Sequence, residues 1–249
     1  MGFEGWLGNK HLTGVFMMGL YMFGFLKIAD KLATTEKKQI EFLKFLVIQL
    51  LFTEFTKYVM ILHRGDVIDA GEFPFFFCSM PLYLFPLIMY GSDKTKEFVT
   101  STGLIFGIMG GAAVLWYPAN VLHPEYNWFY NFGFNDAMVS IFFHMLILLF
   151  PIYVLKTGYY KFKASDFKKT VFTFVLLSLM AICLNKLIPG ADYFFLERGE
   201  GNPIGGLIKT NWLLYVITMM GIEIAFIYII FIPAFLREKK YKQMVEYVR

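Results

Sequence analysis

The sequence has few of the residues on which catalytic metal sites and disulfide frameworks depend. Only 17% of its 249 residues are charged, and it holds two cysteines and four histidines. Two cysteines inside apolar runs fit neither a secreted disulfide scaffold nor a zinc ribbon, and no two histidines form an HxxxH pair. The P-loop and the G-x-S-x-G motif are also missing. We therefore expect no metal, nucleotide or other cofactor.

Two further absences exclude particular partners. The formal charge of +4 is small and forms no basic stripe, which argues against binding to nucleic acid. A retinal-binding protein needs a Schiff-base lysine in its last span, and residues 213–236 contain none.

Apolar residues, in contrast, are abundant. The chain is 57% hydrophobic and 20% aromatic, with a mean hydropathy of +0.56, whereas a soluble domain is about 45–50% apolar. About 20 apolar residues cross a bilayer as a helix. Windows of this length predict seven spans, at residues 11–29, 40–62, 73–91, 98–117, 137–155, 169–188 and 213–236. We predict a single all-α, polytopic domain over residues 1–249, multi-pass in the cell membrane.

The basic residues between the predicted spans are distributed unequally, and short cytoplasmic loops carry the excess of Lys and Arg. Fifteen lie on one side: Lys31, Lys37, Lys38, Lys94, Lys96, Lys156, Lys161, Lys163, Lys168, Lys169, Arg237, Lys239, Lys240, Lys242 and Arg249. Four lie on the other: Lys10, Arg64, Arg198 and Lys209. This asymmetry predicts an external N-terminus and a cytoplasmic C-terminus.

Several polar residues within the spans lie at similar depth on the outer side. At a rise of 1.5 Å per residue, Glu54, Cys78 and His144 are roughly 8–12 Å from the outer ends of their spans. Lys57 shares a helix face with Glu54, and Asn185 lies in the last turn of its span. Ionisable groups at bilayer depth are costly and indicate function by default. We expect an outward-facing polar pocket.

A thiol at the level of an imidazole indicates nucleophilic chemistry. Histidine can deprotonate cysteine, the thiolate attacks an ester carbonyl, and a second nucleophile resolves the thioester. In this hypothesis Cys78 is the nucleophile, His144 is the general base, and Asn185 is an oxyanion or orienting donor. Glu54 and Lys57 would orient the histidine or bind a headgroup.

The same residues also have structural interpretations. A buried Cys78 can be a small hydrophobic side chain, and a membrane histidine such as His144 can simply bond between helices. Glu54 and Lys57 can form a salt bridge that fixes helix register. A disulfide between Cys78 and Cys183 is a further alternative, because both lie at similar estimated depth.

Three prolines interrupt the third predicted span, whose residues 72–91 read EFPFFFCSMPLYLFPLIMYG. Pro74 is expected in the first helical turn, where its missing N–H would be unpaired anyway. Pro81 and Pro86 are expected to kink the helix close to Cys78.

Four segments, in order, resemble the YwaF-type family of integral membrane proteins, which has a eukaryotic branch. FPFFFC at 73–78 is similar to its LPLHLC, and IFGIMGGAAVLWYP at 105–118 is similar to its FFG-x-x-GA-x-x-ALL-x-P. FFHMLILLFPIY at 142–153 is similar to its histidine-bearing span. N-x4-G-x-D-Y-x-F-L at 185–196, followed by NP at 202–203, resembles its N-x4-G-x-NY-x-FL and NP segment.

The resemblance implies a seven-helix fold with an external N-terminus. It also implies cysteine-dependent acyl transfer onto ether-linked phospholipid, with Cys78 matching the nucleophile and His144 matching the histidine. Two positions depart from the pattern. Phe76 replaces the histidine of LPLHLC and removes a polar neighbour of the thiol, whereas Asp192-Tyr193 replaces Asn-Tyr and keeps a hydrogen-bonding group.

We therefore expect an integral membrane lipid acyltransferase or acyl hydrolase whose partner is membrane lipid. One alternative is a membrane carrier or ligand-binding protein that uses the same pocket, and another is a structural or accessory subunit. Ser140, one turn from His144, is expected to tune that histidine. The expected substrate-binding residues are Glu54, Lys57, Ser140, Asp192 and Tyr193.

Overall fold

The computed structural model describes residues 9–70, 72–116, 136–199, 202 and 204–248, and this part of the chain is helical without strands. Its helices are α1 (Asn9–Leu32), α2 (Glu36–His63), α3 (Met80–Tyr90), α4 (Asp93–Trp116), α6 (Asp136–Thr157), α7 (Asp166–Leu187) and α8 (Trp212–Val248). Short 3-10 helices are η1 (Phe77–Ser79), η2 (Tyr193–Phe195) and η3 (Gly205–Lys209). The predicted all-α fold is confirmed, and these helices are compatible with a polytopic membrane protein.

Local sequence explains several helix ends. The Thr35 hydroxyl accepts a hydrogen bond from the Lys38 N–H at 3.4 Å and so caps α2. Gly158 follows α6 with φ of +74°, a left-handed conformation in which glycine ends a helix without a steric penalty. Thr35 thus marks the end of the α1–α2 connection, and Gly158 marks the start of the α6–α7 connection.

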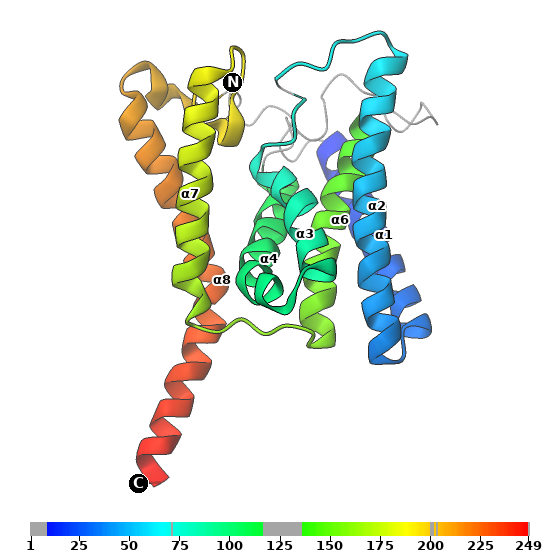
Figure 1. Cartoon of the computed structure of the whole chain (residues 1–249), viewed down its shortest axis with the longest axis vertical. Coiled ribbons are helices and arrows are strands. Elements are labelled where there is room, and N and C mark those ends of the chain that lie inside the picture. The colour runs from blue at the N-terminus through cyan, green and yellow to red at the C-terminus, as the bar shows by residue number, and fades with distance from the viewer. Residues whose placement is uncertain (1–8, 71, 117–135, 200–201, 203, 249) are drawn as a thin grey trace.

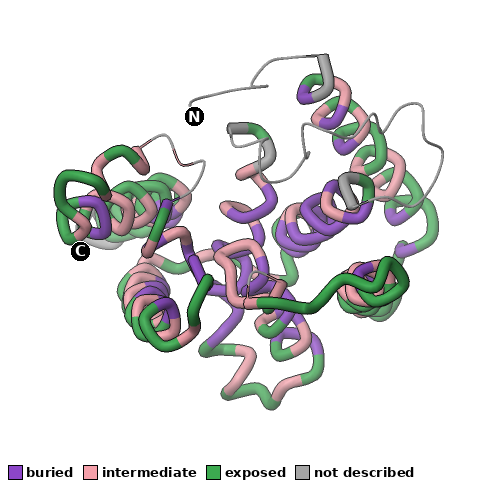
Figure 2. Tube along the Cα trace, turned by 90° about the horizontal axis from the view of Figure 1, so that it is seen from above, coloured by how far each residue is buried: buried purple, intermediate pink, exposed green. Residues whose placement is uncertain are grey.

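Helix α4 lies at the centre of the bundle. It contacts η1, α3, α6, α7 and α8, while α1 and α2 pack on the other side of α6. Figure 1 shows α7 and α8 as a pair on one side of α4, with α1 and α2 on the opposite side. Buried residues gather on the inward faces of the helices, and exposed residues lie around the outside (Figure 2). The core therefore surrounds α4.

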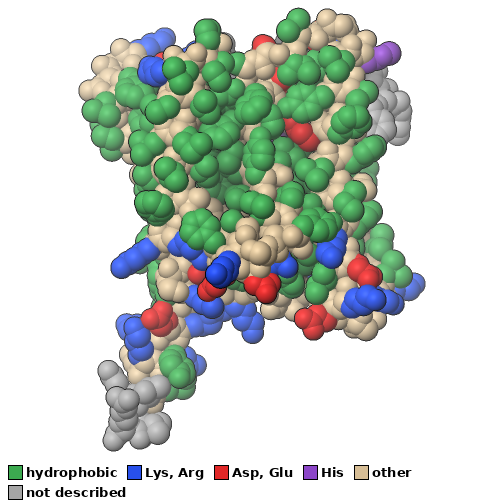
Figure 3. Space-filling view, in the orientation of Figure 1, with side chains coloured by type: hydrophobic (Ala, Val, Ile, Leu, Met, Phe, Trp, Pro, Cys, Tyr) green, Lys and Arg blue, Asp and Glu red, His purple; other side chains and the backbone are tan. Residues whose placement is uncertain are grey.

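The outer surface is suited to lipid. Large apolar side chains such as Phe16, Phe52 and Phe172 are exposed, and hydrophobic side chains cover most of the body in Figure 3. Among the described residues, five helices are long and apolar enough to cross a membrane: α1 from His11, α2, α6 from Met138, α7, and α8 as far as Met244. Lys and Arg gather below the apolar body, where α8 extends downward (Figures 1 and 3). This surface fits a polytopic membrane protein.

The third predicted span is shorter than expected. Helix α3 begins only at Met80, after non-helical residues 72–76 and the turn η1. Pro74 therefore lies outside the helix, and Pro81 is in its first turn, so the predicted start at Pro74 and kink at Pro81 were wrong. The physical reason is that the chain begins the helix at the later proline, where the missing N–H breaks no intrahelical bond. Pro86 is inside α3 as predicted.

Figure 1 shows the connection from α2 to α3 descending from the upper rim into the bundle before α3 begins. Non-helical backbone at membrane depth is tolerated where protein buries it or where it lines a cavity. Helix α3 has 11 residues and so covers only about half of the hydrocarbon thickness. Cys78 consequently lies at the end of a descending loop, directly before a half-length helix.

Candidate functional site

Glycines on α4 allow its neighbours to approach closely. Gly103, Gly107 and Gly111 recur every four residues, which places them on one helix face. A Cβ built at Gly103 would lie 2.8 Å from Ile88 Cδ1 of α3, and one at Gly107 would lie 2.6 Å from the backbone oxygen of Ile147 of α6. Small residues permit this backbone proximity between membrane helices. The glycine face thus packs directly against α3 and α6.

Two consecutive glycines on α4 contact the backbones that carry the predicted catalytic pair. A Cβ at Gly110 would lie 2.9 Å from Cys78 Cα and 3.2 Å from Cys78 Cβ. A Cβ at Gly111 would lie 3.0 Å from the backbone oxygen of His144. The Gly110 position is also 3.4 Å from Ile147 Cδ1, so Cys78 borders α6. The structure therefore places Cys78 and His144 against adjacent residues of one helix.

The His144 ring is buried, and its orientation is fixed within its own helix. Its Nδ1 lies 2.7 Å from the backbone oxygen of Ser140. A carbonyl oxygen only accepts hydrogen bonds, so we assign the proton of the neutral ring to Nδ1. Nε2 then carries a lone pair that can accept a proton. Ser140 orients His144 through its backbone oxygen.

Cys78 is half-buried and lies in η1, at the N-terminal end of α3. The helix dipole places a partial positive charge at this end of α3. Cys183 lies exposed on α7, and both cysteines are free. The alternative disulfide between them is not formed.

A charged cluster ties α2 to the loop that leads to Cys78. Lys57 Nζ lies 3.5 Å from Glu54 Oε1 and 3.1 Å from Glu72 Oε2. The Tyr58 hydroxyl donates to the backbone oxygen of Glu72 at 2.8 Å. The predicted Glu54–Lys57 pair is thus present, but sequence reasoning missed Glu72 and Tyr58. Glu72 opens the EFPFFFC stretch, and this acidic residue at the edge of an apolar run was the available signal.

Asn185 holds the loop that follows α7. Its Nδ2 donates to the Tyr193 backbone oxygen at 3.0 Å, and its Oδ1 accepts from the Tyr193 N–H at 2.7 Å. Asp192 Oδ1 accepts from the N–H groups of Glu197 and Arg198 at 2.9 and 3.0 Å. The nitrogen and the oxygen of the Asn185 amide therefore both form hydrogen bonds to the Tyr193 backbone. The sequence suggested that Asn185 is either an oxyanion donor or an orienting donor, and this arrangement favours the orienting role.

The same loop presses aromatic rings against the segment before Cys78. Phe194 and Phe195 both have φ of +56°, a left-handed conformation that is unusual for bulky residues and persists only when the surroundings enforce it. The ring centroid of Phe194 lies 5.7 Å from that of Phe77, and Phe195 lies 5.7 Å from Phe76. Phe76, at the position of the family histidine, is therefore part of an aromatic cluster.

Tyr193 and Asp192 support the wall of the site and are both buried. The Tyr193 ring lies 5.6 Å from Phe76, nearly edge-on. Burial, with a smaller contribution from the Asp69 carboxylate, raises the pKa of the Tyr193 phenol, so this group stays neutral at physiological pH. Asp192 Oδ2 is buried and has no hydrogen-bond partner among the described residues.

The arrangement supplies a thiol, an imidazole and a nearby ion cluster. Within the described ranges, no three His, Cys, Asp or Glu residues lie close enough to hold a metal ion. A thiol and an imidazole in one region of a bundle are the groups that nucleophilic attack by sulfur with proton transfer to nitrogen requires.

Comparison with known protein families gives a match over most of the chain. Residues 6–231 match the TMEM164 family, a family of membrane proteins. The YwaF-type name suggested by the four sequence segments is not confirmed by this match. No curated protein and no solved structure matches the chain.

Proposed function

Because the chain belongs to the TMEM164 family of membrane proteins, we propose that it is an integral membrane acyltransferase or acyl hydrolase that acts on lipid. The observation that carries this proposal is the packing of Cys78 and His144 against Gly110 and Gly111, consecutive residues of α4. The sequence resemblance to a family with cysteine-dependent acyl transfer supports the same chemistry.

The first half-reaction forms a thioester. His144 Nε2 takes the proton of the Cys78 thiol, and the sulfur attacks the carbonyl carbon of a lipid ester. The oxygen of the tetrahedral intermediate bears negative charge, which the electropositive end of α3 stabilises. When the intermediate collapses, the C–O bond breaks and the departing lysolipid oxygen takes the proton from His144.

The second half-reaction releases the acyl group. An acceptor hydroxyl gives its proton to His144 Nε2 and attacks the thioester carbonyl, after which the C–S bond breaks and the sulfur regains the proton. A lipid hydroxyl as acceptor makes the protein a transferase, and water makes it a hydrolase. The family resemblance favours an ether-linked phospholipid as acceptor.

The remaining site residues bind or position groups next to Cys78 and His144. Lys57 is positioned to bind a lipid phosphate, because its ammonium is partly exposed beside the loop that leads to Cys78. Asn185 is a positioning residue, since it fixes the loop whose aromatic rings pack on the segment before the thiol.

The test compares two matched cysteine variants of the purified full chain in detergent micelles. Cys78→Ser and Cys183→Ser each remove one free thiol. Each variant is supplied with phospholipid and lysophospholipid acceptor, and acyl transfer and fatty acid release are followed by mass spectrometry. We expect Cys78→Ser to lose at least about 100-fold in turnover, because oxygen is a poorer nucleophile without activation, and Cys183→Ser to retain it.

Two other results would contradict the proposal that the protein is an enzyme. Equal turnover in both variants removes Cys78 from the chemistry. The ion cluster at bilayer depth also suits a carrier, which would bind a solute at Glu54 and Lys57. Solute transport that persists in Cys78→Ala and is lost in Glu54→Gln would establish the carrier instead.

A further inference from the structure

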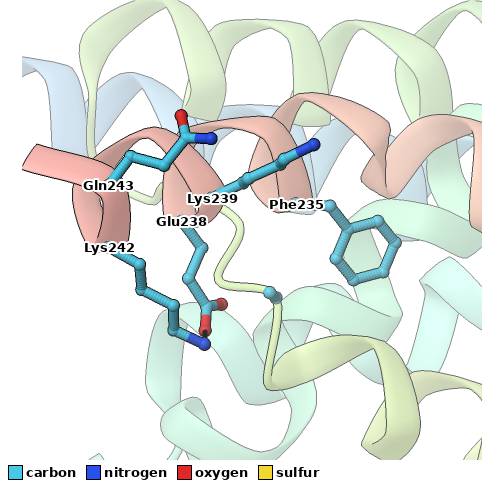
Figure 4. Close-up of a pocket in the computed structure, with 6 residues that line it drawn as sticks. Phe235, Glu238, Lys239, Lys242 and Gln243 are labelled. Carbon is cyan, nitrogen blue, oxygen red and sulfur yellow. Dashed lines mark ion pairs between the residues drawn. The ribbon is translucent and has the colours of Figure 1, made fainter. Parts of the chain in front are cut away.

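A pocket lies far from the candidate site, between α8 and the connection that joins α6 to α7. Its volume is about 470 Å³. Figure 4 shows α8 forming one side, with the α6–α7 connection opposite. The lining residues are Ala164, Phe235, Glu238, Lys239, Lys242 and Gln243.

The pocket carries more positive than negative charge. Lys242 Nζ pairs with Glu238 Oε1 at 2.9 Å, as the dashed line in Figure 4 marks. Lys239 has no acidic partner in the part of the chain that the structure describes. Arg237 Nη2 donates to the backbone oxygen of Phe162 at 2.8 Å and holds the connection against α8. Two ammonium groups, one of them paired with Glu238, therefore line the pocket.

One end of the pocket is apolar and is formed by Phe235, which lies on α8 one turn before Lys239. Phe235 packs edge-on against Phe167 of α7, with ring centroids 5.6 Å apart, and close to Tyr228 at 5.5 Å. In Figure 3 the hydrophobic surface ends at the level where Lys and Arg side chains begin. The pocket thus combines an aromatic wall that belongs to the lipid-facing body with ammonium groups at the headgroup level.

We propose that this pocket binds the phosphate of an anionic glycerophospholipid, with Lys239 and Lys242 contacting the phosphate and Phe235 contacting the acyl side. Basic clusters directly beyond a membrane helix attract anionic lipids, which are enriched in the cytoplasmic leaflet. The charge asymmetry predicts that this end of α8 is cytoplasmic. The proposal involves none of the residues of the acyl-transfer site.

The experiment uses the purified full chain in dodecyl maltoside, with dioctanoyl phosphatidylglycerol as the probe and native mass spectrometry as the measurement. Each lysine near an anionic headgroup is expected to contribute about fivefold in affinity, so Lys239→Gln/Lys242→Gln should bind roughly 20-fold more weakly. Glu238→Gln should bind more tightly, because it removes the competing carboxylate. The charge-matched control Lys37→Gln/Lys38→Gln, at the start of α2, should bind as the unmodified chain does.

Three outcomes would overturn the proposal. The first is an equal loss of lipid in the Lys239→Gln/Lys242→Gln protein and in the control. The second is equal binding of zwitterionic dioctanoyl phosphatidylcholine. The third is displacement of the lipid by inorganic phosphate at the same concentration, which would identify a site for a free anion. Thermal unfolding of each variant checks that the fold is retained. If the Lys239→Gln/Lys242→Gln protein is misfolded, the lipid affinity of the Glu238→Gln protein tests the proposal instead.

Discussion

Cys78 and His144 reach the same region of the bundle by different routes. His144 lies in the regular helix α6, where the backbone oxygen of Ser140 fixes its ring. Cys78 lies where a loop ends and α3 begins, and its position depends on the packing of η1 against Gly110. One side chain is therefore placed by its own helix, and the other by contacts between elements.

Replacing His144 tests whether this residue acts as a base or only packs within the bundle. His144→Gln keeps a polar side chain of similar size but removes the basic nitrogen, so we expect lipid turnover to fall by about 10²–10⁴-fold. His63→Gln, at the exposed end of α2, is the matched control and should retain full turnover. Turnover is measured by mass spectrometry of acyl products, and folding by thermal unfolding. A fully active His144→Gln protein would remove His144 from the reaction.

The sequence alone predicts Cys78, His144 and Glu54 at one depth, because depth follows from position along a straight helix. It did not find Glu72, which contacts Lys57 across fifteen residues of chain. No local pattern reports such a contact, since the loop must first fold back onto α2.

At the scale of elements, the glycine face of α4 decides how the bundle closes. The atoms nearest to a Cβ at Gly111 are Leu148 Cβ at 2.5 Å, Leu148 Cα and the His144 backbone oxygen. None of these is the end of a flexible side chain, so a larger residue must push α6 away from α4. The spacing of Gly103, Gly107 and Gly111 was a usable signal for this contact.

This packing predicts the effect of a single methyl group. Gly111→Ala should destabilise the protein by about 1–3 kcal/mol, the usual cost of overpacking, and lower lipid turnover by displacing His144. Gly24→Ala on α1 is the control, because nothing lies within 4 Å of its added Cβ. That variant should be neutral or more stable by up to about 1 kcal/mol, since alanine favours a helix. Thermal unfolding in detergent measures both, and equal stability of the two variants would contradict the packing.

At the scale of the whole molecule, the surface divides into an apolar body and a basic end. The lower rim contains the α6–α7 connection and the end of α8, and Lys and Arg gather there (Figure 3). The connection between α2 and α3 lies on the opposite rim (Figure 1). Positive charge on cytoplasmic loops predicts that these two rims face opposite sides of the membrane.

Two single cysteines test this orientation. In a chain that carries Cys78→Ser and Cys183→Ser, Val67→Cys marks the upper connection and Tyr241→Cys marks the end of α8, and both positions are exposed. We expect an impermeant maleimide to label Val67→Cys in intact cells and Tyr241→Cys only after permeabilisation. The reverse labelling pattern would invert the predicted topology.

The sequence by itself determined the membrane-protein class and the all-α fold, because apolar run length and hydropathy are local properties of the chain. Residue type and depth also make Cys78 and His144 the predicted site residues. Only the tertiary structure decided that α3 begins at the second proline, that Cys78 and the backbone of His144 pack against Gly110 and Gly111, and that Asn185 holds the backbone of Tyr193. These features depend on contacts between segments that are distant in the sequence. The free energies of such contacts cannot be read from any short stretch of the sequence.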